Sequence, residues 1–270
     1  MKKRLLTGLL AGLLILSLSA CTHDDPTPSA SPSPESLPSA VPSATPAVTA
    51  TPAPSQPPVW GDQAFARTFT AGDGTTVLTV HYVLPMVQNT DACAAGTAIN
   101  DWYKSLGSSL LASAEDNYEA AVSDYEVSKA AGYSFTPTAE EMNYEVTYAD
   151  SMVYSIRRTW SITGGSPYPS TFFLSEHFDS MTGIKLGFAD LFSDADTVQK
   201  RVVAAFLEQE EIVAGQFTEA QIIAVYQPEN FCLTQEGYTF WIQGNDLPAL
   251  HSPVEITLSY DSMKDVSLHG

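Results

Sequence analysis

Hydrophobic and polar positions change their period several times along the chain, and each change predicts a new structural element. Residues 64–70 and 76–84 alternate on either side of Gly72-Asp73-Gly74, a pattern typical of a β-hairpin. From about residue 90 to Gly132, apolar and aromatic residues recur every three or four positions. This spacing predicts a helix, and Gly107-Ser108-Ser109 is a candidate break within it.

The remainder of the chain mixes both periods. Alternation predicts strands at residues 143–148, 153–162, 171–178, 231–233, 238–242 and 254–259, and helical spacing predicts helices at 196–212 and 218–225. Because strands and helices come in blocks, we expect an α+β fold with antiparallel sheets, packed helices and two interlocked subdomains. The tripeptide Asp-Ser-Met begins at residues 150, 179 and 261. Its unequal intervals indicate three separate turns or caps.

The first twenty residues resemble an export signal. Lys2, Lys3 and Arg4 precede an apolar run at residues 5–16, which is shorter than the roughly 20 residues that a membrane-spanning helix needs. The ending Leu18-Ser19-Ala20-Cys21 is similar to a bacterial lipobox, in which the cysteine is lipidated. We therefore expect residues 1–20 to be a removed lipoprotein signal peptide and Cys21 to carry acyl chains that anchor the chain at the outer face of the cell membrane. A plain signal peptide and an uncleaved anchor are the alternatives.

Residues 21–59 are rich in Pro, Ser, Thr and Ala, which predicts an extended, disordered linker. At about 3.1 Å per residue it would reach roughly 120 Å, a length that suits a thick, Gram-positive-like wall. The 4 Trp, 12 Tyr and 12 Phe all lie at or after Trp60, so the folded part begins there. We expect two modules, residues 60–148 and 149–270.

Charge and cysteine content narrow the functional classes. A formal net charge of -19 argues against nucleic-acid binding and favours cationic partners, although solubility alone also explains it. Besides Cys21, the chain has Cys93 and Cys232. Export would permit a disulfide between them, but we favour two buried free thiols.

The sequence contains no assembled catalytic motif. It lacks a Gly-x-Ser-x-Gly elbow, a phosphate-binding loop and two histidines at metal-ligand spacing, so we predict no catalytic residues, no metal and no cofactor. Glu176, His177 and Asp179 are the one candidate acid–base or metal group. Adjacent residues on a strand point to opposite faces, however, so Glu176 and His177 should diverge.

An ordered set of motifs resembles a known extracellular family. The motifs are Trp160-Ser-Ile-Thr-Gly-Gly165, Thr171-Phe-Phe-Leu-Ser-Glu-His-Phe-Asp179 with Thr182-Gly183, Leu186 with Asp190-Leu-Phe192, Glu229-Asn-Phe231, Gly237-Tyr238 with Phe240, and Val254-Glu-Ile-Thr-Leu-Ser-Tyr260. Together with the segment from Tyr82 through Asn100, they are similar to the paired modules of the RsiV/PdaC-like family. That family includes the lysozyme-binding region of a sigma-V anti-sigma factor and the non-catalytic N-terminal region of a peptidoglycan deacetylase. The likeness covers about Gln63 to Val266.

The resemblance implies a non-enzymatic surface domain that binds a cationic wall-active protein such as lysozyme, or peptidoglycan. The implied contact loop includes Thr163, Gly164, Gly165 and Tyr168. The family's Thr-Gly-Gly-Ala-His is Thr-Gly-Gly-Ser-Pro here, so its histidine is missing. For the two glycines themselves we favour a simpler interpretation, a bulge or turn between two strands that needs positive φ. We expect neither a sigma-binding region before the signal segment nor a deacetylase domain after the modules.

Two other functions stay open at this stage. The first is a hydrolase or deacetylase acting on peptidoglycan, with Glu176, His177 and Asp179 among its candidates. The second is a structural envelope lipoprotein whose acidic surface only keeps it soluble.

Overall fold

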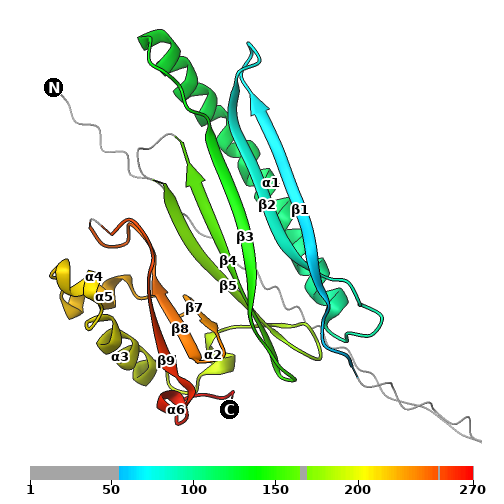
Figure 1. Cartoon of the computed structure of the whole chain (residues 1–270), viewed down its shortest axis with the longest axis vertical. Coiled ribbons are helices and arrows are strands. Elements are labelled where there is room, and N and C mark those ends of the chain that lie inside the picture. Colours follow the sequence, from blue (N-terminus) through cyan, green and yellow to red (C-terminus); the bar gives the residue numbers. More distant parts are fainter. Residues whose placement is uncertain (1–54, 165–168, 249, 270) are drawn as a thin grey trace, which may run out of the picture. The chain divides into compact units, whose positions relative to one another are not determined.

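A computed structural model describes residues 55–164, 169–248 and 250–269 (Figure 1). The predicted signal peptide, Cys21 and nearly all of the predicted linker lie outside these residues. In chain order the elements are β1 (Trp60–Thr70), β2 (Thr76–Val87), α1 (Gly96–Ala131), β3 (Thr138–Ala149), β4 (Val153–Thr163), β5 (Ser170–Asp179), β6 (Lys185–Leu186), α2 (Phe188–Leu191), α3 (Ala195–Phe206), α4 (Glu210–Ala214), α5 (Glu219–Val225), β7 (Phe231–Leu233), β8 (Gly237–Ile242), β9 (Val254–Ser259) and α6 (Tyr260–Met263).

The strands form two sheets, and the predicted α+β class is confirmed. One sheet has the order β1-β2-β3-β4-β5-β6, and the other has the order β7-β8-β9. All neighbouring strands run antiparallel except β2 and β3, which are parallel. The larger sheet is therefore mixed rather than antiparallel throughout. The reason is α1, which carries the chain from the end of β2 back to the level where β3 begins.

The long helix α1 is continuous, so the predicted break at Gly107-Ser108-Ser109 is wrong. A Cβ at Gly107 would overlap the ring of Phe65, which means that glycine here lets β1 pack closely against the helix. The hydroxyls of Ser108 and Ser109 donate to carbonyl oxygens one turn earlier, so both residues are accommodated inside the helix. The helix ends at Gly132, as predicted, in a left-handed conformation with φ of 69°.

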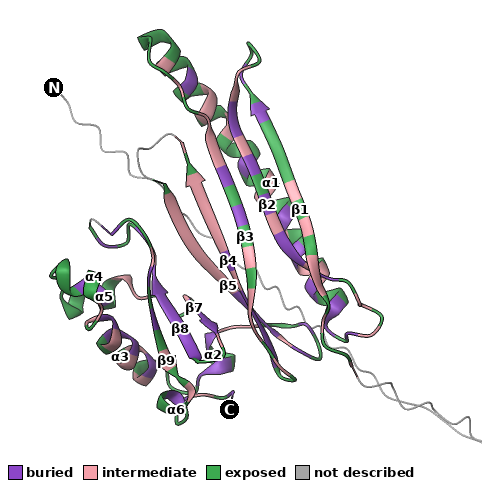
Figure 2. Ribbon diagram, in the orientation of Figure 1, coloured by how far each residue is buried: buried purple, intermediate pink, exposed green. Residues whose placement is uncertain are grey.

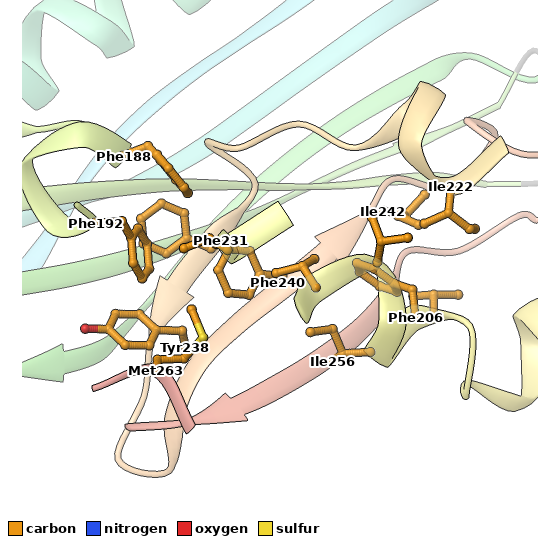
Figure 3. Close-up of a cluster of buried hydrophobic side chains, with 14 of the residues drawn as sticks. Phe188, Phe192, Phe206, Ile222, Phe231, Tyr238, Phe240, Ile242, Ile256 and Met263 are labelled. Atoms are coloured by element: carbon orange, nitrogen blue, oxygen red, sulfur yellow. The ribbon is translucent and has the colours of Figure 1, made fainter. Parts of the chain in front are cut away.

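Each sheet contributes to its own hydrophobic core. The first core lies between α1 and the six-stranded sheet and includes Tyr82, Tyr103 and Met142. The second lies between the three-stranded sheet and helices α3 to α5, where Phe206, Phe231 and other apolar side chains meet (Figure 3).

Strand β8 is buried along its whole length (Figure 2). Tyr238 and Phe240 face the second core, whereas Trp241 packs edge-on against Phe173 of β5 at 5.9 Å between ring centroids. A strand that is covered on both faces explains a continuous apolar run in place of strict alternation.

Side-chain hydrogen bonds join the two sheets. Gln243 donates to the carbonyl of Phe173 at 2.6 Å and accepts from its amide at 3.0 Å. The Ser175 hydroxyl donates to the carbonyl of Phe231 at 2.5 Å. The predicted boundary at residues 148 and 149 falls at the end of β3, whose neighbour β4 belongs to the same sheet. The division into two modules stays a prediction.

Cys93 and Cys232 are both buried free thiols in the structure. Cys93 belongs to the core beneath α1, and Cys232 lies in the middle of β7. Burial raises the pKa of Cys232 to about 11, so its thiol is protonated and a poor nucleophile near neutral pH. Among the described residues, no helix combines the length and apolar character that crossing a membrane requires.

Candidate binding site

The loop predicted to contact a ligand is only partly described. Thr163 is exposed at the end of β4, and Gly165 and Tyr168 lie outside the described residues. Gly164 has φ of 80°, and a Cβ there would overlap the carbonyl of Pro137. Positive φ and close approach to the segment before β3 are therefore sufficient reasons for this glycine.

Glu176 points toward α1 and forms a buried ion pair. Arg158 donates to its two carboxylate oxygens at 3.0 and 2.5 Å, and the Tyr103 hydroxyl donates to it at 3.2 Å. The side chains of Arg158 and Glu176 are only 6% and 3% exposed. Burial disfavours the charge on Arg158, but the carboxylate outweighs this effect and the pKa of Arg158 is raised. The ion pair is therefore shielded from solvent and has a structural role in the core.

His177 lies on the opposite face of β5, as the alternation predicted. Its ring stacks on Phe231 at 4.5 Å between centroids, and its Nδ1 is 3.1 Å from the hydroxyl oxygen of Ser155. Its Nε2 has no hydrogen-bond partner among the described residues. Burial, followed by the nearby charge of Lys185, lowers the pKa of His177 to about 3. The ring is therefore neutral and structural.

Asp179, the third candidate, closes the turn after β5. Its carboxylate accepts from the amides of Met181 and Thr182 at 3.1 and 2.7 Å and from the Thr182 hydroxyl. These bonds lower the pKa of Asp179, so it is a carboxylate that holds a turn. Glu176, His177 and Asp179 therefore lie in three separate places and do not form one site.

A hollow of about 500 Å³ lies elsewhere, where the β3–β4 turn meets α6 and the C-terminal segment. We call it the turn-end pocket, and its lining residues are Tyr148, Asp150, Met152, Tyr260, Asp261, Lys264, Ser267 and His269. The pocket and the Thr163 loop are at opposite ends of β4. With 11 residues in that strand, at about 3.3 Å each, they are separated by roughly 35 Å.

Three rings form one wall of the turn-end pocket, and Nε2 of His269 lies 3.4 Å from the Asp150 carboxylate. The centroids of Tyr148 and Tyr260 are 6.1 Å apart, and the His269 ring stands perpendicular to Tyr148 at 5.7 Å. The Tyr260 hydroxyl donates to the carbonyl of Thr234 at 2.7 Å, which fixes this ring. Burial raises the pKa of both tyrosines, and for Tyr148 the neighbouring carboxylate of Asp150 adds to the effect.

The two carboxylates of the pocket are held differently. Asp150 accepts from the amides of Met152 and Val153 at 2.7 and 2.8 Å and from the Tyr148 hydroxyl at 3.2 Å. Asp261, by contrast, forms an ion pair at 3.0 Å with Lys264 one turn along, and both side chains are largely exposed. Exposed pairs of this kind contribute little stability, so Asp261 can exchange its partner easily.

All three Asp-Ser-Met tripeptides contribute to this region. Asp150–Met152 forms the β3–β4 turn and Asp179–Met181 the turn after β5, where Ser180 donates to two backbone carbonyls of the first turn, at 3.0 and 2.5 Å. Asp261–Met263 lies in α6, with Asp261 at the pocket and Met263 buried in the core below. Unequal spacing predicts three separate turns or caps. That these three segments lie close together was not predicted, and the repeated tripeptide was the only sequence signal for it.

Exposed apolar side chains extend the region beyond the pocket. Met152, Met181, Ile184 and Leu268 are all more than half exposed. Met152 and Leu268 also line a second hollow of about 290 Å³, which shares His269 with the turn-end pocket. Flexible, polarizable methionines on an exposed apolar patch are typical of surfaces that bind other proteins.

The fold belongs to the class of α+β domains in which a mixed sheet, crossed by one long helix, packs against a smaller antiparallel sheet. Two solved structures share it. A DUF3298 family member from Bacteroides fragilis NCTC 9343 has a TM-score of 0.58 and 13% identity, covering 78% of this chain and 93% of that chain. A DUF3298 family protein from Pseudomonas aeruginosa PAO1 has a TM-score of 0.51 and 13% identity, covering 79% and 96%.

At this level of identity the likeness concerns the fold alone. DUF3298 is the domain found in RsiV/PdaC-like proteins, so the shared fold agrees with the resemblance that the sequence motifs indicate. No family model matches the sequence, and no curated protein matches it.

Proposed function

We propose that this chain is a lipid-anchored lipoprotein of the outer cell surface whose folded domain binds a partner without catalysing a reaction. The signal-like residues 1–20, Cys21 and the proline-rich linker support export and anchoring. The favoured partner is a cationic wall-active protein such as lysozyme, with peptidoglycan as the other ligand of the same function. A net charge of -19 supports the cationic protein, because it attracts such a partner over long range.

The turn-end pocket is the observation that carries the binding role. It combines aromatic walls, two carboxylates and adjoining exposed methionines in one concave region. The candidate hydrolase residues Glu176, His177 and Asp179, in contrast, lie apart from one another, two in the protein interior and one in a turn. A site for contact therefore has structural support, and no observation favours the hydrolytic alternative.

Binding is tested with the purified protein and lysozyme over a salt series. Affinity should fall at least tenfold between about 0.1 M and about 1 M salt, because the Debye length shrinks from about 10 Å to about 3 Å. Lysozyme with acetylated lysines is the matched control and should bind much more weakly at low salt. Sedimentation with purified peptidoglycan tests the second ligand. The proposed function would be rejected if the protein bound neither lysozyme nor peptidoglycan.

Anchoring is tested separately with radiolabelled palmitate in a bacterial host that processes lipoproteins. The wild-type chain should incorporate label and fractionate with membranes, whereas Cys21→Ala should incorporate no label, because the acyl chains require this thiol. Equal labelling of the two proteins, or a cytosolic wild-type chain, would contradict the anchor.

A further inference from the structure

Building on the proposed function, we infer that the turn-end pocket receives a lysine or arginine side chain of the protein partner. The inference rests on three features of the pocket: the geometry of its aromatic rings, the partners of its two carboxylates, and the exposed apolar surface beside them.

The rings provide the first argument. Tyr148, Tyr260 and His269 come from β3, α6 and the C-terminal segment, with centroids 5.7 to 6.5 Å apart. The faces of Tyr148 and Tyr260 attract cations that lie within about 6 Å of the ring centre, and two such rings beside one hollow strengthen this attraction. Both tyrosines are partly exposed, so their faces are accessible from the hollow.

The carboxylates provide the second argument. Asp150 is fixed at the base of the β3–β4 turn by two backbone amides, and its other oxygen lies 3.2 Å from the Tyr148 hydroxyl and 3.4 Å from Nε2 of His269. Asp261 pairs with Lys264, whose ammonium group therefore already occupies a cation position at the pocket. Because this ion pair is exposed and weak, an incoming ammonium or guanidinium group can replace Lys264.

The surrounding surface selects against other ligand classes. A phosphate or carboxylate ligand would meet the like charges of Asp150 and Asp261, and the ammonium group of Lys264 at the pocket is already paired with Asp261. A lysine or arginine has, besides its charge, an apolar stem that would lie along Met152 and the tyrosine rings. A neutral sugar could stack on the rings, but it would gain nothing from the carboxylates. Sugar binding is therefore an alternative outcome of the test.

The carbon-13-labelled methyl group of Met152 reports on the pocket directly. The full chain is titrated with N-acetyl-arginine amide, with its neutral counterpart N-acetyl-norleucine amide, and with an N-acetylglucosamine oligomer. We expect a saturable shift of the Met152 methyl signal with the arginine probe only, with a dissociation constant on the order of millimolar. The methyl group of Met142, which is buried in the core between α1 and the six-stranded sheet, should not respond.

Two exposed substitutions give opposite expected signs. Lys264→Gln removes the competing cation and should strengthen binding of the arginine probe about twofold to fivefold, whereas Asp261→Asn should weaken it by a similar factor. Lys104→Gln and Glu126→Gln, both exposed on α1, are matched charge controls and should leave it unchanged.

Three results would overturn the inference: no shift of Met152 with the arginine probe, a shift with the sugar alone, or weaker probe binding after Lys264→Gln. The lysozyme measurement separates this inference from the proposed function. If lysozyme binds and the arginine probe does not, the function stands and the pocket assignment falls. If the probe binds and neither lysozyme nor peptidoglycan does, the pocket assignment stands alone.

Discussion

Replacing Arg158 by methionine should lower the free energy of unfolding by about 3–5 kcal/mol. The substitution leaves the Glu176 carboxylate buried, with only the Tyr103 hydroxyl as its remaining partner among those described above. A carboxylate that loses its counter-charge in the interior must either stay unpaired or take up a proton, and both are costly. Urea unfolding of the wild type and of Arg158→Met measures the difference.

The double variant Arg158→Met with Glu176→Leu is the informative control. Removing both charges eliminates the unpaired group, so we expect this variant to recover most of the lost stability. Arg67→Met is a surface control, because Arg67 and its partner Glu115 are both about half exposed. It should change stability by less than about 1 kcal/mol. A single variant as stable as the wild type would show that the core tolerates the isolated carboxylate.

Acidification should weaken the fold through His177. Its pKa is about 3 in the folded chain, against 6.5 as the ordinary value, so below 6.5 the unfolded chain binds a proton that the folded chain does not. The stability that this difference contributes is complete above 6.5 and is lost as the pH falls toward 3. From about pH 7.5 to about pH 4.5, we expect His177 alone to cost about 2–3 kcal/mol.

His177→Phe tests the assignment because it keeps an aromatic ring against Phe231 and removes the titration. Urea unfolding of this variant should show a smaller loss of stability between the two pH values than the wild type. His81→Phe, at an exposed position on β2, should keep the wild-type pH dependence. If His177→Phe and the wild type lost stability equally on acidification, another group would be responsible.

Local patterns predicted the elements well. The turns at Gly72–Gly74 and Asp179–Gly183 and the end of α1 at Gly132 appear where the sequence placed them, because turns and caps depend on a few adjacent residues. The capping box of Thr218 with Gln221 likewise begins α5. The predicted helix at 196–212 divides into α3 and α4, because the Leu207–Gln209 segment turns away from helical geometry.

Features that depend on distant residues were not predictable in this way. The parallel pairing of β2 with β3 and the role of Gly107 against Phe65 both need the packed arrangement. The turn-end pocket joins residues near 150 with residues near 265, and nothing in either stretch specifies the other. Alternation did separate Glu176 from His177 correctly, because that argument involves only the geometry of one strand.

The parallel pairing of β2 with β3 also has a consequence for how the chain finds its fold. The β1–β2 hairpin and the β3–β4–β5 meander each close over short stretches of sequence, whereas joining them requires the whole of α1 to span the gap. Closing a long segment costs more chain entropy than closing a turn, so the two pieces should form early and dock late. We therefore expect the docking of the two pieces across α1 to be slower than the formation of either piece.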